Sequence, residues 1–269
     1  MASGVKTVNG LVLRAVDSGE HDRLVTLLTE EGSLTVSAKG ARSLRSRYMP
    51  ACMPYVFGNY EIAFRGNSCW LRDASVTEPF AAIGKSISAV YLATYFTEVC
   101  LELTAPGAES GELLRLALNS LYALDRHMRP EAQIKAVFEL RAAVLAGYMP
   151  DLSSCRVCGA SSGGFSLDVM NGGLICPDCT AKAPKVPPDA PRGAVPTDAL
   201  GTRSIIMPLT PGALEAMRYI VDSDEKHIFS FTLAAGTDMN RLASACQTYL
   251  LSHLERGFTS LKIYYEVCE

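Results

Sequence analysis

Four cysteines are spaced as metal ligands. Two Cys-x2-Cys pairs, Cys155/Cys158 and Cys176/Cys179, are separated by seventeen residues. Each pair can turn through one tight loop and direct two thiolates at a single point, and four thiolates form the tetrahedral cage that zinc prefers. Pro177 inside the second pair, and several glycines beside both pairs, allow sharp turns. Because four sulfur ligands leave no open position for a substrate, the spacing predicts one structural Zn²⁺ ion.

Other uses of paired cysteines fit this sequence less well. An iron–sulfur cluster draws on tighter cysteine runs, and a redox dithiol usually occurs once, beside a βαβ unit that is missing here. The chain has nine cysteines in 269 residues and an N-terminus without the apolar core of a secretory signal. This odd number disfavours a disulfide framework, so we expect a cytoplasmic protein in a reducing compartment. The cysteines outside the two pairs are scattered: Cys52, Cys69, Cys100, Cys246 and Cys268.

Basic residues concentrate in one part of a chain whose net charge is −3. Between Gly32 and Arg72 the only acidic residue is Glu61, and aromatic residues such as Tyr48 and Trp70 are interleaved. Cations can follow phosphates while rings stack on unpaired bases, so this segment predicts local nucleic-acid binding. The predicted contact residues are Lys39, Arg42, Arg45, Arg47, Arg65 and Arg72. The alternative is a solvated arginine-rich loop whose neighbouring aromatics are buried, and Trp70 fits both interpretations.

No constellation of residues indicates catalysis. The four histidines, His21, His127, His227 and His253, are isolated in the sequence, and no Gly-x-Ser-x-Gly motif is present. The glycine-rich stretch near Gly163 lacks the Lys-Ser/Thr pair of a phosphate-binding loop. No apolar run approaches the roughly 18 residues that span a bilayer. We therefore expect neither an enzyme, nor a small-molecule substrate, nor a membrane.

The spacing of apolar residues changes along the chain, from the alternation of strands to the period of helices. Short alternating runs predict five strands, which suggest a small barrel: 8–16, 24–29, 34–38, 55–64 and 69–76. Helical spacing begins after Pro79, a third helix opens at Pro130, and two further helices follow at 212–221 and 239–255. Residues 260–267 alternate and predict a last short β-like segment.

The sequence thus predicts an α+β protein in five segments. They are a nucleic-acid-binding barrel domain at 1–79, a helical bundle at 80–150, a four-cysteine zinc insert at 151–182, a proline-rich linker at 183–209, and C-terminal helices at 210–269 that complete the helical domain.

Several segments, taken in order, resemble the RecO family of recombination mediators and strand-annealing proteins. They are Lys39-Gly40-Ala41-Arg42 with Ser46-Arg47, Phe138–Arg141 and Leu145–Leu152 leading into Cys155, Thr210–Ile220, and His253–Phe258 with Ser260-Leu261-Lys262. The resemblance spans essentially the whole chain.

The resemblance implies an N-terminal OB-fold and a role in DNA repair without catalysis. Such proteins bind single- and double-stranded DNA, anneal complementary strands, contact the tail of the single-strand-binding protein SSB, and act with RecR to help RecA load; this implies work at the nucleoid. Lys39, Arg42, Arg45 and Arg47 would contact DNA, and the four paired cysteines match the family's zinc ligands. For the SSB tail, Lys135 and Arg141 are weak candidates. Two alternatives stay open, a zinc-stabilised scaffold that binds only proteins and an RNA-binding OB module.

Overall fold

The computed structural model describes residues 4–43, 45–66, 68–182 and 205–268. These residues form two compact units, which are described separately. The first unit contains the chain up to residue 128 together with residues from 258 onward, and the second contains residues 129–257. The division into five segments stays a prediction.

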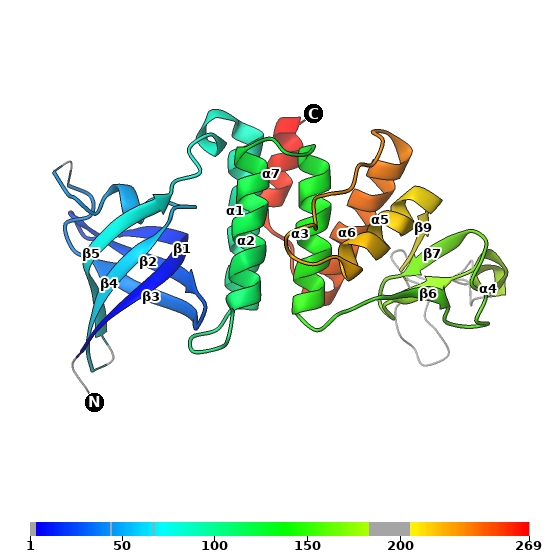
Figure 1. Ribbon diagram of the computed structural model, residues 1–269, viewed down its shortest axis with the longest axis horizontal. Helices are drawn as coiled ribbons and strands as arrows, with labels where there is room; N and C mark the ends of the chain where they lie inside the picture. The colour runs from blue at the N-terminus through cyan, green and yellow to red at the C-terminus, as the bar shows by residue number, and fades with distance from the viewer. Residues whose placement is uncertain (1–3, 44, 67, 183–204, 269) are drawn as a thin grey trace, which may run out of the picture. The chain divides into compact units, whose positions relative to one another are not determined.

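A closed five-stranded barrel forms the N-terminal part of the first unit (Figure 1). Its strands are β1 (Gly4–Ser18), β2 (Asp22–Thr29), β3 (Gly32–Ala38), β4 (Phe57–Arg65) and β5 (Ser68–Glu78), with a short 3-10 helix, η1 (Pro50–Cys52), before β4. The strand order β1-β2-β3-β5-β4, closed by β1, is that of an OB-fold. The expected α+β fold with an OB barrel is confirmed.

The length of β1 closes the barrel. Its first half, up to Leu11, pairs with β4, and its second half, from Leu11, pairs with β2. A register shift between Val12 and Arg14 lets the strand bend between its two partners. Alternate residues such as Val25, Val36 and Leu71 fill the interior of the barrel.

Three helices complete the first unit. They are α1 (Ile87–Leu103), α2 (Gly111–Asp125) and α7 (Thr259–Cys268), and a 3-10 turn, η2 (Ile83–Lys85), precedes α1. The β2–β3 turn rests on the α1–α2 loop, since Gly32 has a φ of 99° and a Cβ there would lie 2.2 Å from the carbonyl oxygen of Ala105. The barrel and these helices are therefore packed too tightly at this point to admit a side chain.

The expectation of a β-like segment at 260–267 is wrong. These residues form α7, which packs against α1 (Figure 1). Ser260, Leu261 and Tyr264 are its buried residues, a helical spacing, although Leu261, Ile263, Tyr265 and Val267 alternate in sequence. The burial against α1 decides the conformation where the local pattern suits two.

The second unit combines helices with a small sheet. Its helices are α3 (Glu131–Leu145), α5 (Pro211–Asp222) and α6 (Thr237–Leu254), with α3 packed on α6 and on α5. The sheet has the order β6-β8-β7-β9, built from β6 (Asp151–Cys155), β8 (Gly173–Ile175), β7 (Phe165–Asp168) and β9 (Ile206–Leu209), and α4 (Pro177–Lys182) follows β8.

Only the end of the expected proline-rich linker lies within the described residues. Residues 183–204 lie outside them, whereas Ile206–Leu209 is the strand β9, which pairs antiparallel with β7. Pro208 sits in this strand at the edge of the sheet, a position where the missing N–H is tolerated.

Candidate metal centre and nucleic-acid interface

The four paired cysteines meet at one point of the second unit. Cys155 ends β6, Cys158 lies in the turn that follows, Cys176 follows β8, and Cys179 lies in α4. Their sulfur atoms all lie within 4.8 Å of one another, and those of Cys158 and Cys176 are 3.7 Å apart. Zn–S bonds of about 2.3 Å would place tetrahedral sulfur atoms about 3.8 Å apart. The cluster could therefore hold one metal ion, and its donor set and spacing fit zinc.

Backbone hydrogen bonds shape the first cysteine loop. The N–H of Gly159 donates to the carbonyl of Cys155 at 2.8 Å, and Gly159 has a φ of 76°, which closes the turn at little steric cost. Burial raises the pKa of the Cys155 thiol, but N–H groups of Cys158, Cys176 and Val157 outweigh it and lower that pKa to about 6. The loop therefore favours the thiolate, which is the form that binds metals.

An ion pair braces this loop from outside the cluster. Arg156 Nη1 lies 3.1 Å from the carboxylate of Asp168 on β7, and the amide of Asn171 donates to the same carboxylate. The backbone N–H of Arg156 also donates to Leu174 on β8. These contacts fix the loop to both neighbouring strands and keep Cys155 beside Cys176.

The predicted basic residues all lie exposed on the barrel. Lys39 follows β3, three arginines lie between β3 and η1, Arg65 ends β4, and Arg72 lies on β5. The segment after β3 is hydrogen-bonded to the β1–β2 turn. Arg42 donates from its backbone N–H to the carbonyl of His21 and from Nη1 to the carbonyl of Gly19. In OB-folds the β1–β2 loop and the face of strands 2 and 3 are the usual oligonucleotide surface.

The same segment is attached to β5 at its other end. The hydroxyl of Tyr48 donates to the carbonyl of Arg72, and the guanidinium of Arg47 lies 4.9 Å from the centre of the Tyr48 ring. The structure thus brings Arg42, Arg47 and Arg72 onto one connected part of the barrel surface, although the last is far from the others in sequence.

The six cations differ in how far they are already neutralised. Arg42 lies 3.2 Å from Asp17, Arg47 lies 3.8 Å from Asp73, and Arg72 lies 3.5 Å from Glu61. Within the part of the chain that the structure describes, the others have no acidic partner; they are Lys39, Arg45 and Arg65. The basic segment by itself does not distinguish the six cations, because the partners Asp17 and Asp73 lie outside it.

The two weak candidates for a protein-tail contact do not present free cations at the surface. Lys135 is buried with a relative side-chain exposure of 1%, and its Nζ lies 2.9 Å from Glu139 in the same helix. Arg141 donates from Nη1 to the carbonyls of Ile220, Val221 and Ser223 at the end of α5. Both side chains are engaged within the second unit: the burial of Lys135 removes it from the surface, while a tail contact by the partly buried Arg141 stays a prediction.

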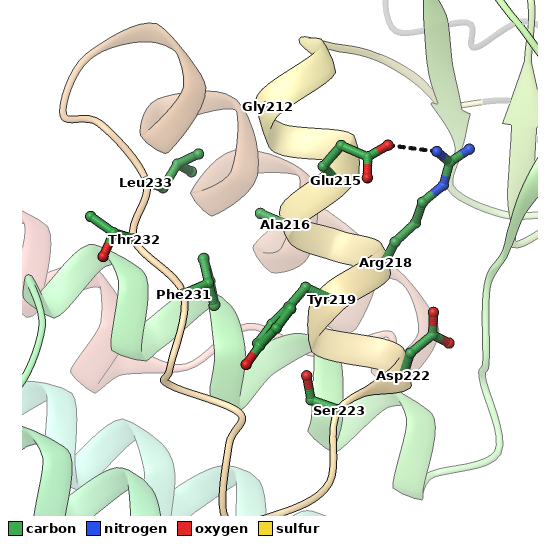
Figure 2. Close-up of a pocket in the computed structure, with 10 residues that line it drawn as sticks. All are labelled: Gly212, Glu215, Ala216, Arg218, Tyr219, Asp222, Ser223, Phe231, Thr232 and Leu233. Atoms are coloured by element: carbon green, nitrogen blue, oxygen red, sulfur yellow. Dashed lines mark hydrogen bonds and ion pairs between the residues drawn. The ribbon is translucent and has the colours of Figure 1, made fainter.

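A pocket of about 800 Å³ lies in the second unit, between α5 and residues 231–233 (Figure 2). Tyr219, Phe231 and Leu233 give it an apolar wall. Arg218 lines it as well, with Nη1 at 2.7 Å from Glu215 and Nε donating to the carbonyl of Leu152. The pocket thus offers apolar side chains, and the guanidinium of Arg218 at its edge points away from Phe231 and Leu233, toward the carboxylate of Glu215 (Figure 2).

The barrel and the cysteine cluster place the protein in a class: an OB-fold protein with basic residues on its barrel and four clustered cysteines that could hold a metal ion. Residues 1–80 match the family described as recombination protein O N terminal, and residues 84–195 match recombination protein O C terminal. The chain therefore belongs to the RecO family, whose role is in DNA repair and recombination. Among the described residues, no helix has the length and apolar character that a membrane crossing requires.

Relatives from several organisms cover most of this chain. DNA repair protein RecO of Anaeromyxobacter sp. (strain K) is 37% identical over 214 residues, which are 78% of this chain and 80% of that protein. DNA repair protein RecO of Myxococcus xanthus is 37% identical over 178 residues, 65% of this chain and 72% of that protein. That of Acetivibrio thermocellus is 27% identical over 256 residues, 94% of this chain and 93% of that protein.

Proposed function

We propose that this protein is a non-catalytic recombination mediator. It binds single- and double-stranded DNA, anneals complementary strands and, with RecR, helps load RecA on SSB-coated DNA at the nucleoid. The observation that carries the DNA-binding step is the basic surface of the OB barrel, formed by Lys39, Arg42, Arg45, Arg47, Arg65 and Arg72. Family membership supports the recombination role.

The proposed mechanism is electrostatic and independent of sequence. Cations of the barrel follow the phosphates of a strand, displace its counterions, and leave the bases accessible to a second strand. Complementary strands held on such surfaces meet at a raised local concentration, which accelerates annealing. No bond is made or broken by the protein, so neither a nucleophile nor a nucleotide is needed.

We also propose that the four cysteines hold one structural Zn²⁺ ion. Cys155, Cys158, Cys176 and Cys179 supply the complete tetrahedral set. The ion would cross-link β6, β8 and α4, and α4 has no buried residue of its own to hold it in place.

For the SSB tail, we propose the pocket beside α5 (Figure 2). An acidic tail with an apolar end would place that end against Tyr219 and Phe231, while Arg218 at the edge of the pocket offers the cation for its acidic part. Glu215 competes for that cation, so Glu215→Gln should strengthen the binding of a labelled tail peptide, while Tyr219→Ala should weaken it. If neither change affects binding, the tail binds elsewhere.

The first experiment is strand annealing. Two complementary oligonucleotides, one with a donor fluorophore and one with an acceptor, are mixed with and without the protein at 50 mM and 200 mM KCl. We expect acceleration that fades with salt. A protein-only scaffold would give no acceleration and no binding at either salt concentration. An RNA-binding module would prefer an RNA strand of the same sequence in a direct competition.

A further inference from the structure

A row of cross-strand neighbours on the outside of the barrel is unusually apolar. The register joins Val16 of β1 to Leu24 of β2, Leu24 to Ser37 of β3, and Ser37 to Trp70 of β5. Directly paired residues point to the same face of a sheet. The adjacent residues Ala15, Val25, Val36 and Leu71 contribute to or pack on the barrel core, so the row itself faces outward.

The apolar side chains of this row are partly exposed and do not fill the barrel core. Val16 is 40% exposed and Leu24 is 42% exposed, and Trp70, the only tryptophan of the chain, is half-buried and absent from the barrel core. A single exposed aliphatic side chain is ordinary, but three apolar side chains in a row of four, interrupted by the small Ser37, indicate a contact surface. The middle of the row, Leu24 on β2 and Ser37 on β3, lies on the two strands whose face OB-folds use for oligonucleotides.

Polar and basic residues border the row on both sides. On one side lie the hydroxyls of Thr26 and Thr35, which hydrogen-bond each other at 3.0 Å, and Arg14 is the β1 neighbour of Thr26. On the other side Lys39 and Arg72 each lie two residues beyond a member of the row. Among the described residues Arg14, like Lys39, has no acidic partner.

The carboxylates of β1 and β2 beside the row are already engaged. Asp17 pairs with Arg23 at 3.1 Å and with Arg42 at 3.2 Å, while Asp22 accepts a hydrogen bond from the N–H of Gly40. The surroundings of the row therefore favour an anionic partner that also has flat apolar faces. An unpaired nucleic-acid strand has both properties, whereas a duplex hides its base faces inside the stack.

We propose that Val16, Leu24 and Trp70 form the surface on which the bases of a single strand lie, with one base stacked on Trp70. This inference rests on the proposed function and adds to it, because it separates base contacts from the phosphate contacts of the basic residues. It assigns the row to unpaired strands: duplex DNA uses the cations alone. The row therefore gives the barrel a preference for single strands over duplexes.

The sole tryptophan makes the test direct. Unlabelled oligo(dT) should quench the intrinsic fluorescence of the wild-type protein as bases stack on Trp70, whereas an abasic oligonucleotide of equal length should bind without quenching. Trp70→Ala should weaken single-strand binding by about 5- to 150-fold, the range for loss of one stacked base, with an unchanged salt slope. Trp70→Phe should restore most of the affinity, and duplex binding should not change in either variant.

A matched pair of valines controls for nonspecific effects. Val16→Ser should weaken single-strand binding, and Val76→Ser should not, because Val76 is equally exposed, at 40%, but lies outside the row. Anisotropy of a labelled strand reports binding itself. Binding without quenching, together with unchanged affinity of Trp70→Ala, would overturn the inference and leave the proposed function intact. Equal losses on duplex and single strand would also overturn it. No binding at all would overturn both.

Discussion

Salt dependence should separate the six basic residues of the barrel into two groups. Each cation that contacts a phosphate of a single strand contributes about −0.7 to the slope of log K against log salt. The group without acidic partners is Lys39, Arg45 and Arg65, and its removal by substitution with Gln should flatten the slope by about 2. Between 50 and 200 mM KCl this corresponds to roughly an 18-fold change in affinity supplied by these three side chains.

The paired group is the matched control. Arg42, Arg47 and Arg72 lie 3.2 to 3.8 Å from carboxylates, so part of their charge is neutralised before DNA arrives. Replacing all three by Gln should flatten the slope by less than about 1, since such exposed pairs are weak but still compete with phosphate. Their removal also leaves Asp73 and Glu61 without these partners, while Asp17 keeps Arg23, and the two released carboxylates lower affinity at every salt concentration.

Anisotropy of labelled oligo(dT) across a KCl series measures both slopes, and circular dichroism verifies that the variants fold. If the paired group flattens the slope as much as the unpaired group does, ion pairing does not influence phosphate contacts, and the division of the six cations into two groups is wrong. If neither set changes the slope, phosphates are bound elsewhere.

Three further predictions concern stability and the metal. Cys176→Ser should abolish binding of about one zinc equivalent and sensitise the insert to proteases, whereas the exposed Cys268→Ser, outside the cluster, should keep the metal; retained zinc in Cys176→Ser contradicts the four-sulfur cage. Gly32→Ala should lower the free energy of unfolding by about 2 kcal/mol or more, because its φ is 99° and an added Cβ would meet a backbone oxygen. Gly40→Ala, where φ is 69° but the space is open, should lower the free energy of unfolding by less in the same urea titration. Burial lowers the pKa of His253, so the folded state disfavours its charged form, and the stability of the protein should fall as the pH drops below about 6.5. Between pH 7.5 and 5.5 the urea midpoint of His253→Phe should therefore decrease less than that of the wild-type protein. Equal decreases would contradict this prediction.

Local patterns were sufficient for much of the fold. The strands expected at 24–29 and 34–38 are present, because the alternation that places Val25 and Val36 inward depends only on the pleat of a strand. Thr210 caps α5 by accepting from the N–H of Ala213, a contact three residues along the chain. Such features are set by near neighbours, so a single sequence reveals them.

Patterns of charge were less reliable guides because burial is not local. Lys135 and Glu139 have the i, i+4 spacing of a surface pair, yet both are buried in the second unit, in the helix that packs on α6. The alternating apolar residues of α7 are equally ambiguous without α1 beside them. In each case the same sequence suits two environments, and the rest of the fold selects one.

The sequence by itself determined the cysteine cage and the set of basic residues, since the loops of a Cys-x2-Cys pair are short enough to fix their own geometry. Which cations are neutralised depends on the closed barrel, because closure brings Asp17 and Asp73 to the basic segment. The apolar row likewise exists only after β3 pairs in parallel with β5, which places Trp70 next to Ser37. That pairing joins residues distant in the chain, and no local spacing encodes it.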